Sequence, residues 1–296
     1  MNMQWRGVIP AMTTPFHEDL SVDHEFLAKH CAWMVDNGCT GIVALGSLGE
    51  GGILTAAEKA AVLRTCVNTL GDRAPIVAGI SSLSTADAVD QAKAAEDAGC
   101  SGLMVLPPYV YLGDWRELKA HVAAVFQATK LSCMLYNNPV AYRVDFLPIH
   151  LKELLAEHEN LHAIKESSAD VRRIAALRSL VGERLEILCG VDDLIVEAVG
   201  AGAAGWIAGL VNAFPKESVT LFEQASSGGF EKAFPLYEWF LPLLRMDVVP
   251  KFIQLIKLVQ EEVGMGSRRV RLPRLELAGA ELAEAKAIIA HALRSR

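Results

Sequence analysis

The chain has 296 residues, of which 52% are hydrophobic and 21% charged, and its formal net charge is −7. This is the composition of a globular protein with ample apolar material for a large core. The acidic balance, with no compensating run of basic residues, argues against binding to nucleic acid or to a membrane surface.

The sequence pattern favours a cytoplasmic protein without a metal site. The N-terminal segment MNMQWRGVIPAMTTPF lacks the basic start and long apolar region of a signal peptide. No stretch approaches the roughly 18 apolar residues that would span a bilayer. The cysteines form no CxxC pair, so we predict that they are reduced core residues and hold no metal. They are Cys31, Cys39, Cys66, Cys100, Cys133 and Cys189.

Short β-rich runs alternate along the chain with segments of helical periodicity. Amphipathic stretches such as HEFLAKHCAWMVDNG and AAEKAAVLRTCVNTLG end in glycine, a common residue at helix C-termini. The predicted strands are residues 7–12, 41–46, 75–80, 102–107, 131–137, 161–165, 185–190 and 203–210. After Leu210 the strands stop, and residues 215–264 and 279–294 are predicted to be wholly helical.

Continuous apolar strands that alternate with helices predict parallel pairing, with both faces of the sheet covered. About eight such units match a (β/α)8 barrel. A doubly wound open sheet is disfavoured because no G-x-G-x-x-G loop follows the first strand. We therefore predict an α/β fold, a (β/α)8 TIM barrel over residues 1–214. Residues 215–296 are predicted to add the last barrel helix and a C-terminal helical extension to the same folding unit.

Catalytic groups of parallel barrels lie on the loops that follow the C-terminal ends of the strands. This rule selects a small set of candidates, which are Thr13, Thr14, the loop GSLGE (46–50), Tyr109, Tyr111, Tyr136, Lys165, Gly190 and Asp192.

Lys165 closes the sixth predicted strand, LHAIK. A lysine there can extend its amine into solvent or pair with Glu166. Alternatively, a partly dry barrel mouth lowers the pKa of the lysine by desolvating its ammonium form. The neutral amine then attacks a carbonyl carbon and forms a Schiff base, which acts as an electron sink.

Two neighbouring elements fit this chemistry. Tyr136 ends the preceding strand, and adjacent strands lie about 4.8 Å apart, so its phenol can transfer protons near Lys165. The alternative is a tyrosine that only covers the rim of the barrel. The GSLGE loop offers backbone N–H groups to a carboxylate or phosphate. Glu50 is predicted either to brace this loop or to contact substrate.

Four motifs together resemble one protein family. They are GIVALGSLGEGGILTAAE (41–58), YNNP (136–139), IKES (164–167) and CGVDD (189–193). In order and spacing the chain is similar to the dihydrodipicolinate synthase and N-acetylneuraminate lyase family of Schiff-base-forming lyases, over essentially its full length.

The resemblance implies roles for individual residues. Lys165 would form an imine with a 2-oxo acid, and Tyr136 would move protons beside it. The Ser47 hydroxyl and the N–H groups of Ser47 and Leu48 would hold the substrate carboxylate, and Ile207 would present its carbonyl near the imine. Three further residues, Gly46, Gly190 and Asn138, complete the predicted binding set. The family likeness also implies a homotetramer that needs no cofactor.

Departures from the family pattern bear on the substrate. Synthases of this family have a second hydroxyl residue where Leu48 stands, and a relay tyrosine where Val110 stands between Tyr109 and Tyr111. Their YNVPSR motif supplies an arginine for a second carboxylate, and the corresponding residue here is Ala141. The chain looks more similar to deaminases that convert 1-pyrroline-4-hydroxy-2-carboxylate to 2,5-dioxopentanoate and ammonia. Arg143, two residues beyond Ala141, need not point the same way.

Other functions remain open at this stage. One is 4-hydroxy-tetrahydrodipicolinate synthase, and another is an aldolase or dehydratase of a 2-keto-3-deoxy sugar acid. The hydroxyls of a sugar acid would need polar partners such as Asn137, Asn138, Ser167 and Asp192. A third is a sensor that binds a 2-oxo acid without turnover, which would need neither Lys165 nor Tyr136.

Overall fold

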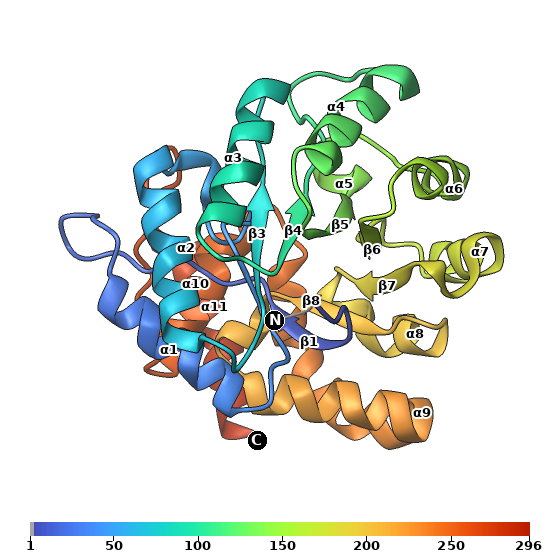
Figure 1. The fold of residues 1–296 in the computed structure, drawn as a ribbon. Helices are drawn as coiled ribbons and strands as arrows, with labels where there is room; N and C mark the ends of the chain where they lie inside the picture. Colours follow the sequence, from blue (N-terminus) through green and yellow to red (C-terminus); the bar gives the residue numbers. More distant parts are fainter. Residues whose placement is uncertain (1–2) are drawn as a thin grey trace.

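The computed structural model describes residues 3–296, which form a parallel barrel enclosed by helices (Figure 1). The strands pair in the order β1-β8-β7-β6-β5-β4-β3-β2. A bridge between Ala11 and Val43 joins the first strand to the second and closes the ring. The predicted (β/α)8 TIM barrel is therefore confirmed. The strands are β1 Gly7–Pro10, β2 Ile42–Ala44, β3 Ile76–Ile80, β4 Gly102–Val105, β5 Ser132–Asn137, β6 Leu161–Glu166, β7 Glu186–Cys189 and β8 Gly205–Ala208.

Helices surround the strands, and α10 and α11 lie behind the barrel in the view of Figure 1. Local signals set helix ends: α2 begins at a capping box of Thr55 and Glu58 and ends at Gly71, whose φ is 52°. The helices are α1 His24–Asp36, α2 Ala56–Leu70, α3 Thr85–Asp97, α4 Trp115–Gln127, α5 Pro139–Tyr142, α6 Pro148–Glu157, α7 Arg172–Val181, α8 Ile195–Gly200, α9 Pro215–Leu244, α10 Phe252–Glu262 and α11 Gly279–Arg294.

The prediction of continuous helix over residues 215–264 is wrong in two places. Gly229 interrupts α9 with a φ of 67°, a left-handed conformation that suits glycine. The chain then leaves α9 in a 3-10 turn at Arg245–Asp247 and enters α10 only at Phe252. Pro250 explains the second break, because a proline disfavours helical backbone at the residue before it.

A buried ion pair joins the C-terminal extension to the barrel. Lys257 of α10 donates to Glu50 over 2.5 Å, and their side chains are only 2% and 0% exposed. The same amine donates to the carbonyl of Arg269 over 2.7 Å and lies 4.3 Å from the centre of the Phe16 ring. Glu50 therefore braces the GSLGE loop, one of its two predicted roles. That residues 1–214 and 215–296 form a single folding unit stays a prediction.

All six cysteines are free and buried, as predicted for reduced core residues. No group of three His, Cys, Asp or Glu residues that could hold a metal ion occurs within residues 3–296. Of the helices described, none combines the length and the apolar character that crossing a bilayer requires.

We expect Lys257→Met to destabilise the protein strongly, because it removes the closest counter-charge of the buried Glu50 and leaves only the more distant Arg274, 3.9 Å away. Removing one partner of such a pair costs about 3–5 kcal/mol. Urea unfolding should show a lower midpoint, and adding Glu50→Gln should restore part of the loss. Lys251→Met removes the exposed pair with Glu281 and serves as the control, with little change expected. A Lys257→Met variant as stable as the control would contradict the bracing role.

Candidate active site

A cavity of about 70 Å³ lies at the C-terminal ends of the strands. One water needs about 10–15 Å³ of such space, so the cavity has room for a small acid rather than a long chain. The structure brings eight predicted residues together here, namely Gly46, Ser47, Leu48, Tyr136, Asn138, Lys165, Gly190 and Ile207. It adds five that were not predicted, namely Ala11, Met104, Gly209, Asp247 and Phe252.

Lys165 lies on β6 directly opposite Tyr136 of β5 in the strand register. Its Nζ is 4.2 Å from the centre of the Tyr136 ring, and the residue is 7% exposed. Burial lowers the pKa of Lys165, against a smaller opposing effect of Asp247 and other nearby groups. The lowered pKa increases the fraction of neutral, nucleophilic amine near neutral pH.

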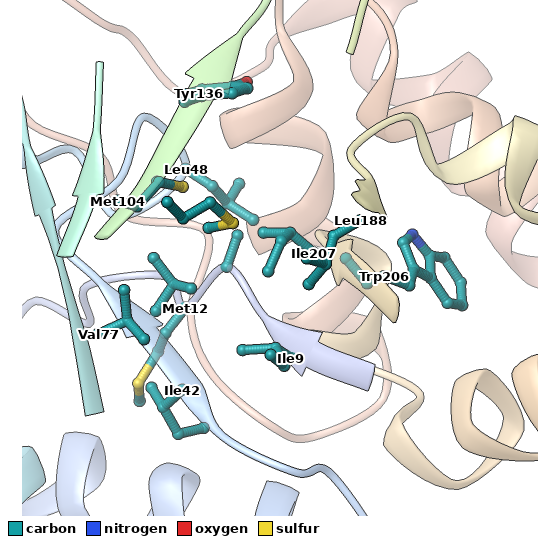
Figure 2. Packing of buried hydrophobic residues seen from close by; sticks show 14 of the residues in the cluster. Ile9, Met12, Ile42, Leu48, Val77, Met104, Tyr136, Leu188, Trp206 and Ile207 are labelled. Atoms are coloured by element: carbon teal, nitrogen blue, oxygen red, sulfur yellow. The ribbon is translucent and has the colours of Figure 1, made fainter. Parts of the chain in front are cut away.

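Tyr136 extends from β5 above Leu48 and Met104 (Figure 2). Burial raises its pKa to about 12, so the phenol is neutral until a reaction step takes its proton. Asn138 donates to the Tyr136 oxygen over 3.0 Å and fixes the orientation of the hydroxyl. The phenol is thus held beside the amine in a position to transfer protons.

The GSLGE loop makes a tight turn between β2 and α2. Leu45 and Glu50, at its two ends, have φ values of 64° and 54°. A Cβ on Gly51 would lie 2.1 Å from the Leu45 carbonyl, so only glycine fits there. No backbone or side-chain group within residues 3–296 accepts from the N–H groups of Ser47 and Leu48. These two donors are free to hold a carboxylate.

Tyr142 is a site residue that the sequence reasoning missed. Its hydroxyl shares a hydrogen bond with the Ser47 hydroxyl, and its ring meets the Tyr136 ring edge-on at 5.8 Å. Burial raises the pKa of Tyr142. A sequence signal existed: Asn138 and Pro139 open a single helical turn, since Asn138 accepts from the Ala141 N–H over 2.9 Å. That turn brings Tyr142 back against Ser47 and Tyr136.

Close packing around the lysine stem requires glycine at position 190. A Cβ there would lie 2.1 Å from the Ser167 Oγ and 2.5 Å from the Lys165 Cε. The Ser167 Oγ itself is buried without a hydrogen-bond partner among the described residues. Gly190 therefore sets the space available beside the amine.

The predicted relay tyrosines are placed differently from each other. Tyr109 is half-buried, and its ring lies 6.2 Å from that of Tyr142. Tyr111 is 58% exposed and donates to Glu117 over 2.8 Å. Val110 and Arg143 are exposed, and neither lines the cavity.

Several polar candidates serve the framework instead of the cavity. Thr13 donates to Gln260, and Thr14 donates to the Gly49 carbonyl. Asn137 donates to Asp145 and Glu166 away from the cavity. In a separate cluster, Asp192 accepts from the Trp206 indole and from the N–H groups of Gly209 and Leu210, which orders the loop after β8.

Comparison with known proteins shows similarity over nearly the whole chain. A profile of the dihydrodipicolinate synthetase family matches residues 4–292. The 4-hydroxy-tetrahydrodipicolinate synthase of Methanococcus vannielii is 32% identical over 92% of this chain and 93% of its own. That of Agrobacterium fabrum is 30% identical over 91% and 92%.

Solved structures agree with this similarity. The dihydrodipicolinate synthase of Aquifex aeolicus superimposes with a TM-score of 0.92, 28% identity and 97% of each chain covered. The enzyme of Acinetobacter baumannii, solved in complex with pyruvate, gives a TM-score of 0.92 at 28% identity, with 98% of each chain covered.

We expect borohydride and pyruvate together to add the mass of one reduced pyruvate at Lys165, because this amine is buried and free of a strong partner. Peptide mass spectrometry should find the label there and not at Lys257, which is equally buried but ion-paired. Half-maximal labelling should occur below the usual pKa of lysine, since burial disfavours the charged form. Labelling that persists in Lys165→Met would exclude Lys165 as the nucleophile.

Proposed function

This chain belongs to the dihydrodipicolinate synthetase family, and from that membership and its cavity we propose that it deaminates 1-pyrroline-4-hydroxy-2-carboxylate to 2,5-dioxopentanoate. The enzymes of the family are lyases that act through a covalent imine of an active-site lysine and use no cofactor. In this chain Lys165 forms the imine and Tyr136 moves protons.

The charge of the cavity is the observation that carries the proposal. Among its described lining residues, Lys165 is the only basic side chain and Asp247 the only acidic one. Once Lys165 is bound as an imine, no cationic side chain of this chain is left for a second carboxylate. Ala141, at the position of the family's arginine, is exposed and lies outside the cavity lining. These features favour a substrate with one carboxylate.

Shape supports the same substrate. Leu48, Met104 and Phe252 give the cavity an apolar wall. The ring carbon atoms of this substrate need no hydrogen-bond partners, so an apolar wall suits that face of the ring. The single carboxylate meets the free N–H groups of Ser47 and Leu48.

The first stage of the reaction opens the ring. The neutral Lys165 amine attacks the C2 carbon of the ring C=N bond, and the ring nitrogen takes a proton from Tyr136 and leaves C2 as a primary amine on C5. C2 is now a protonated imine of Lys165. The Tyr136 phenolate then removes a proton from C3, and the electron pair is delocalised into the imine as an enamine.

The second stage removes water and ammonia. The enamine expels the 4-hydroxyl as water and leaves a C3–C4 double bond conjugated with the lysine imine. Loss of a C5 proton and return of a proton from Tyr136 to C3 leave a C4–C5 enamine, and a proton added at C4 converts this enamine into a protonated C5 imine. Hydrolysis of both imines releases ammonia, 2,5-dioxopentanoate and free Lys165. One water is lost and two are added, which balances the overall reaction.

We propose a proton relay to Tyr136 within one chain, whose last link is an edge-on ring contact. The Ser47 hydroxyl links to Tyr142, whose ring packs against Tyr136. Because Tyr142 comes from α5 of the same chain, this relay does not require a tyrosine at position 110. Tyr142 takes the place that the sequence reasoning gave to Tyr109 or Tyr111.

A second candidate is 4-hydroxy-tetrahydrodipicolinate synthase, because similar curated proteins carry that name. The single basic side chain in the cavity argues against it. A 2-keto-3-deoxy sugar acid fits poorly, since Asn137 and Asp192 are bonded within the framework. The register of Lys165 with Tyr136 argues for catalysis over a sensor role.

The assembly is an expectation from the family, and the location is an expectation from the sequence. Family members are usually tetramers, so we infer a homotetramer for this chain. The cytoplasmic location stays a prediction.

We expect the protein to turn over 1-pyrroline-4-hydroxy-2-carboxylate, with 2,5-dioxopentanoate followed by a coupled aldehyde dehydrogenase. Lys165→Ala should reduce the rate to background, because no amine is left to form the imine. Pyruvate with aspartate semialdehyde is the matched competing assay. Turnover of that pair by the wild type, with none of the cyclic imine, would replace this proposal with the synthase.

We expect Tyr142→Phe to lower kcat about 10²-fold, because it removes one hydroxyl of the proton relay while keeping the ring. Tyr111→Phe removes an exposed hydroxyl and should leave kcat unchanged. Steady-state kinetics of the two variants test the assignment. The reverse result, with loss in Tyr111→Phe alone, would place the relay in the loop after β4.

A further inference from the structure

We propose that Asp247 is a second catalytic residue, whose protonated carboxyl donates the proton that lets the substrate's 4-hydroxyl leave as water. The inference deepens the proposed function and rests on it. The reaction needs this acid, because hydroxide is a poor leaving group and Tyr136 is occupied at C3.

The place of Asp247 in the fold is the first support. It ends the 3-10 turn Arg245–Asp247 between α9 and α10, and it lines the same cavity as Lys165, Tyr136 and Ser47. The cavity therefore has an acid on the C-terminal extension, in addition to the groups carried by the strand ends. A substrate held on Lys165 would share this cavity with both sets of groups.

The second support is an unsatisfied oxygen. Asp247 as a whole is partly exposed, but its Oδ1 is buried and has no hydrogen-bond partner among the described residues. Buried polar atoms are almost always paired, and exceptions often mark functional sites. A hydroxyl group on a bound substrate would supply the missing partner.

Close packing against Gly209 positions this carboxyl. A Cβ on Gly209 would lie 1.9 Å from Oδ1 and 2.4 Å from Cγ of Asp247. The absence of a side chain at position 209 thus lets the carboxyl lie directly over the backbone that follows β8. Any larger residue would displace it.

Comparison with Asp192 shows why Asp247 suits an acid role. Asp192 is fully buried, and burial raises its pKa to about 6, but one indole and two backbone N–H groups donate to it and oppose this effect by stabilising its charged form. Asp247 has no such donors. Burial, and then the charge of Asp192, raise the pKa of Asp247 well above its usual range, with Lys165 opposing the effect. The neutral carboxyl is therefore available as a proton donor.

The proton balance closes without another reagent. Asp247 gives its proton to the C4 oxygen as the C4–O bond breaks, and the electron pair of the enamine forms the C3–C4 double bond. The resulting carboxylate then removes the C5 proton in the isomerisation step. Tyr136 takes the C3 proton and returns it, and Asp247 passes the C5 proton on to C4. Hydrolysis of the two protonated imines then gives one proton back to each residue, so both acids end the cycle as they began.

The test compares Asp247→Asn with the wild type on 1-pyrroline-4-hydroxy-2-carboxylate and on the open-chain acid 4-hydroxy-2-oxopentanoate. Asparagine keeps the shape but cannot donate a proton. We expect water elimination to slow by about 10²-fold or more. Borohydride should trap at Lys165 an adduct heavier by one water than the adduct of the wild type. Exchange of the pyruvate methyl protons with D2O needs only Lys165 and Tyr136, and it should stay within a few-fold of normal.

Asp193→Asn is the matched control, because this neighbouring carboxylate pairs with Arg245 and does not line the cavity. It should behave as the wild type in the water-elimination, borohydride-trapping and pyruvate-exchange assays. If Asp247→Asn fails to fold, Gly209→Ala provides the same test by displacing the carboxyl. Gly209 has a right-handed helical backbone, φ −97° and ψ −52°, which alanine accepts.

Two results for the variant would overturn the inference. One is water elimination at the wild-type rate in Asp247→Asn. The other is loss of pyruvate exchange together with elimination, which would make Asp247 a positioning residue for Lys165.

Assays on both substrates distinguish the acid role of Asp247 from the proposed deaminase function. Asp247-dependent elimination from the open-chain acid, without turnover of the cyclic imine, would reject the proposed function and support the acid role. Elimination from neither compound would overturn both.

Discussion

Burial of a lysine amine without a compensating ion pair is the constraint on which this active site depends. The protein contains two buried lysines, and their surroundings differ. Lys257 donates to Glu50 and to a backbone carbonyl, so its charge is satisfied and it holds the extension on the barrel. No hydrogen bond joins the Lys165 amine to another described residue, and its closest recorded partner is the face of Tyr136. Desolvation therefore favours its neutral form, which is the form that attacks carbon.

The framework around Lys165 keeps this arrangement rigid. The register of β5 and β6 places Tyr136 opposite the lysine, and the space at Gly190 admits the lysine stem. Asp192 orders the loop after β8, and Glu50 anchors the GSLGE loop to Lys257. Tyr136, Asp192 and Glu50 are themselves buried, so the positions of the reacting groups are set by packing and not by flexible surface contacts.

Substrate choice depends on residues outside the strands. Lys165 and Tyr136 lie on strands, whereas Asp247, the one acidic side chain among the described lining residues, lies outside them. Ala141 lies on the surface, and Tyr142 approaches Ser47 from the same short helix. Asp247 comes from the break after α9, where the helical pattern gave no reason to expect a turn. Loops and helix ends can thus alter the steps that follow imine formation, while the imine chemistry itself stays the same.

The sequence by itself determined the barrel, and it selected Lys165, Tyr136 and the GSLGE loop as the predicted site. These follow from local patterns, because strand ends in a parallel barrel all meet at one face and a periodic apolar run shows where each strand ends. Only the tertiary structure decided that Tyr142 reaches Ser47, that Lys257 pairs with Glu50 and that Asp247 lies over Gly209. These contacts join residues between 38 and 207 positions apart. They depend on how the barrel closes and where α9 ends, which no local sequence pattern specifies.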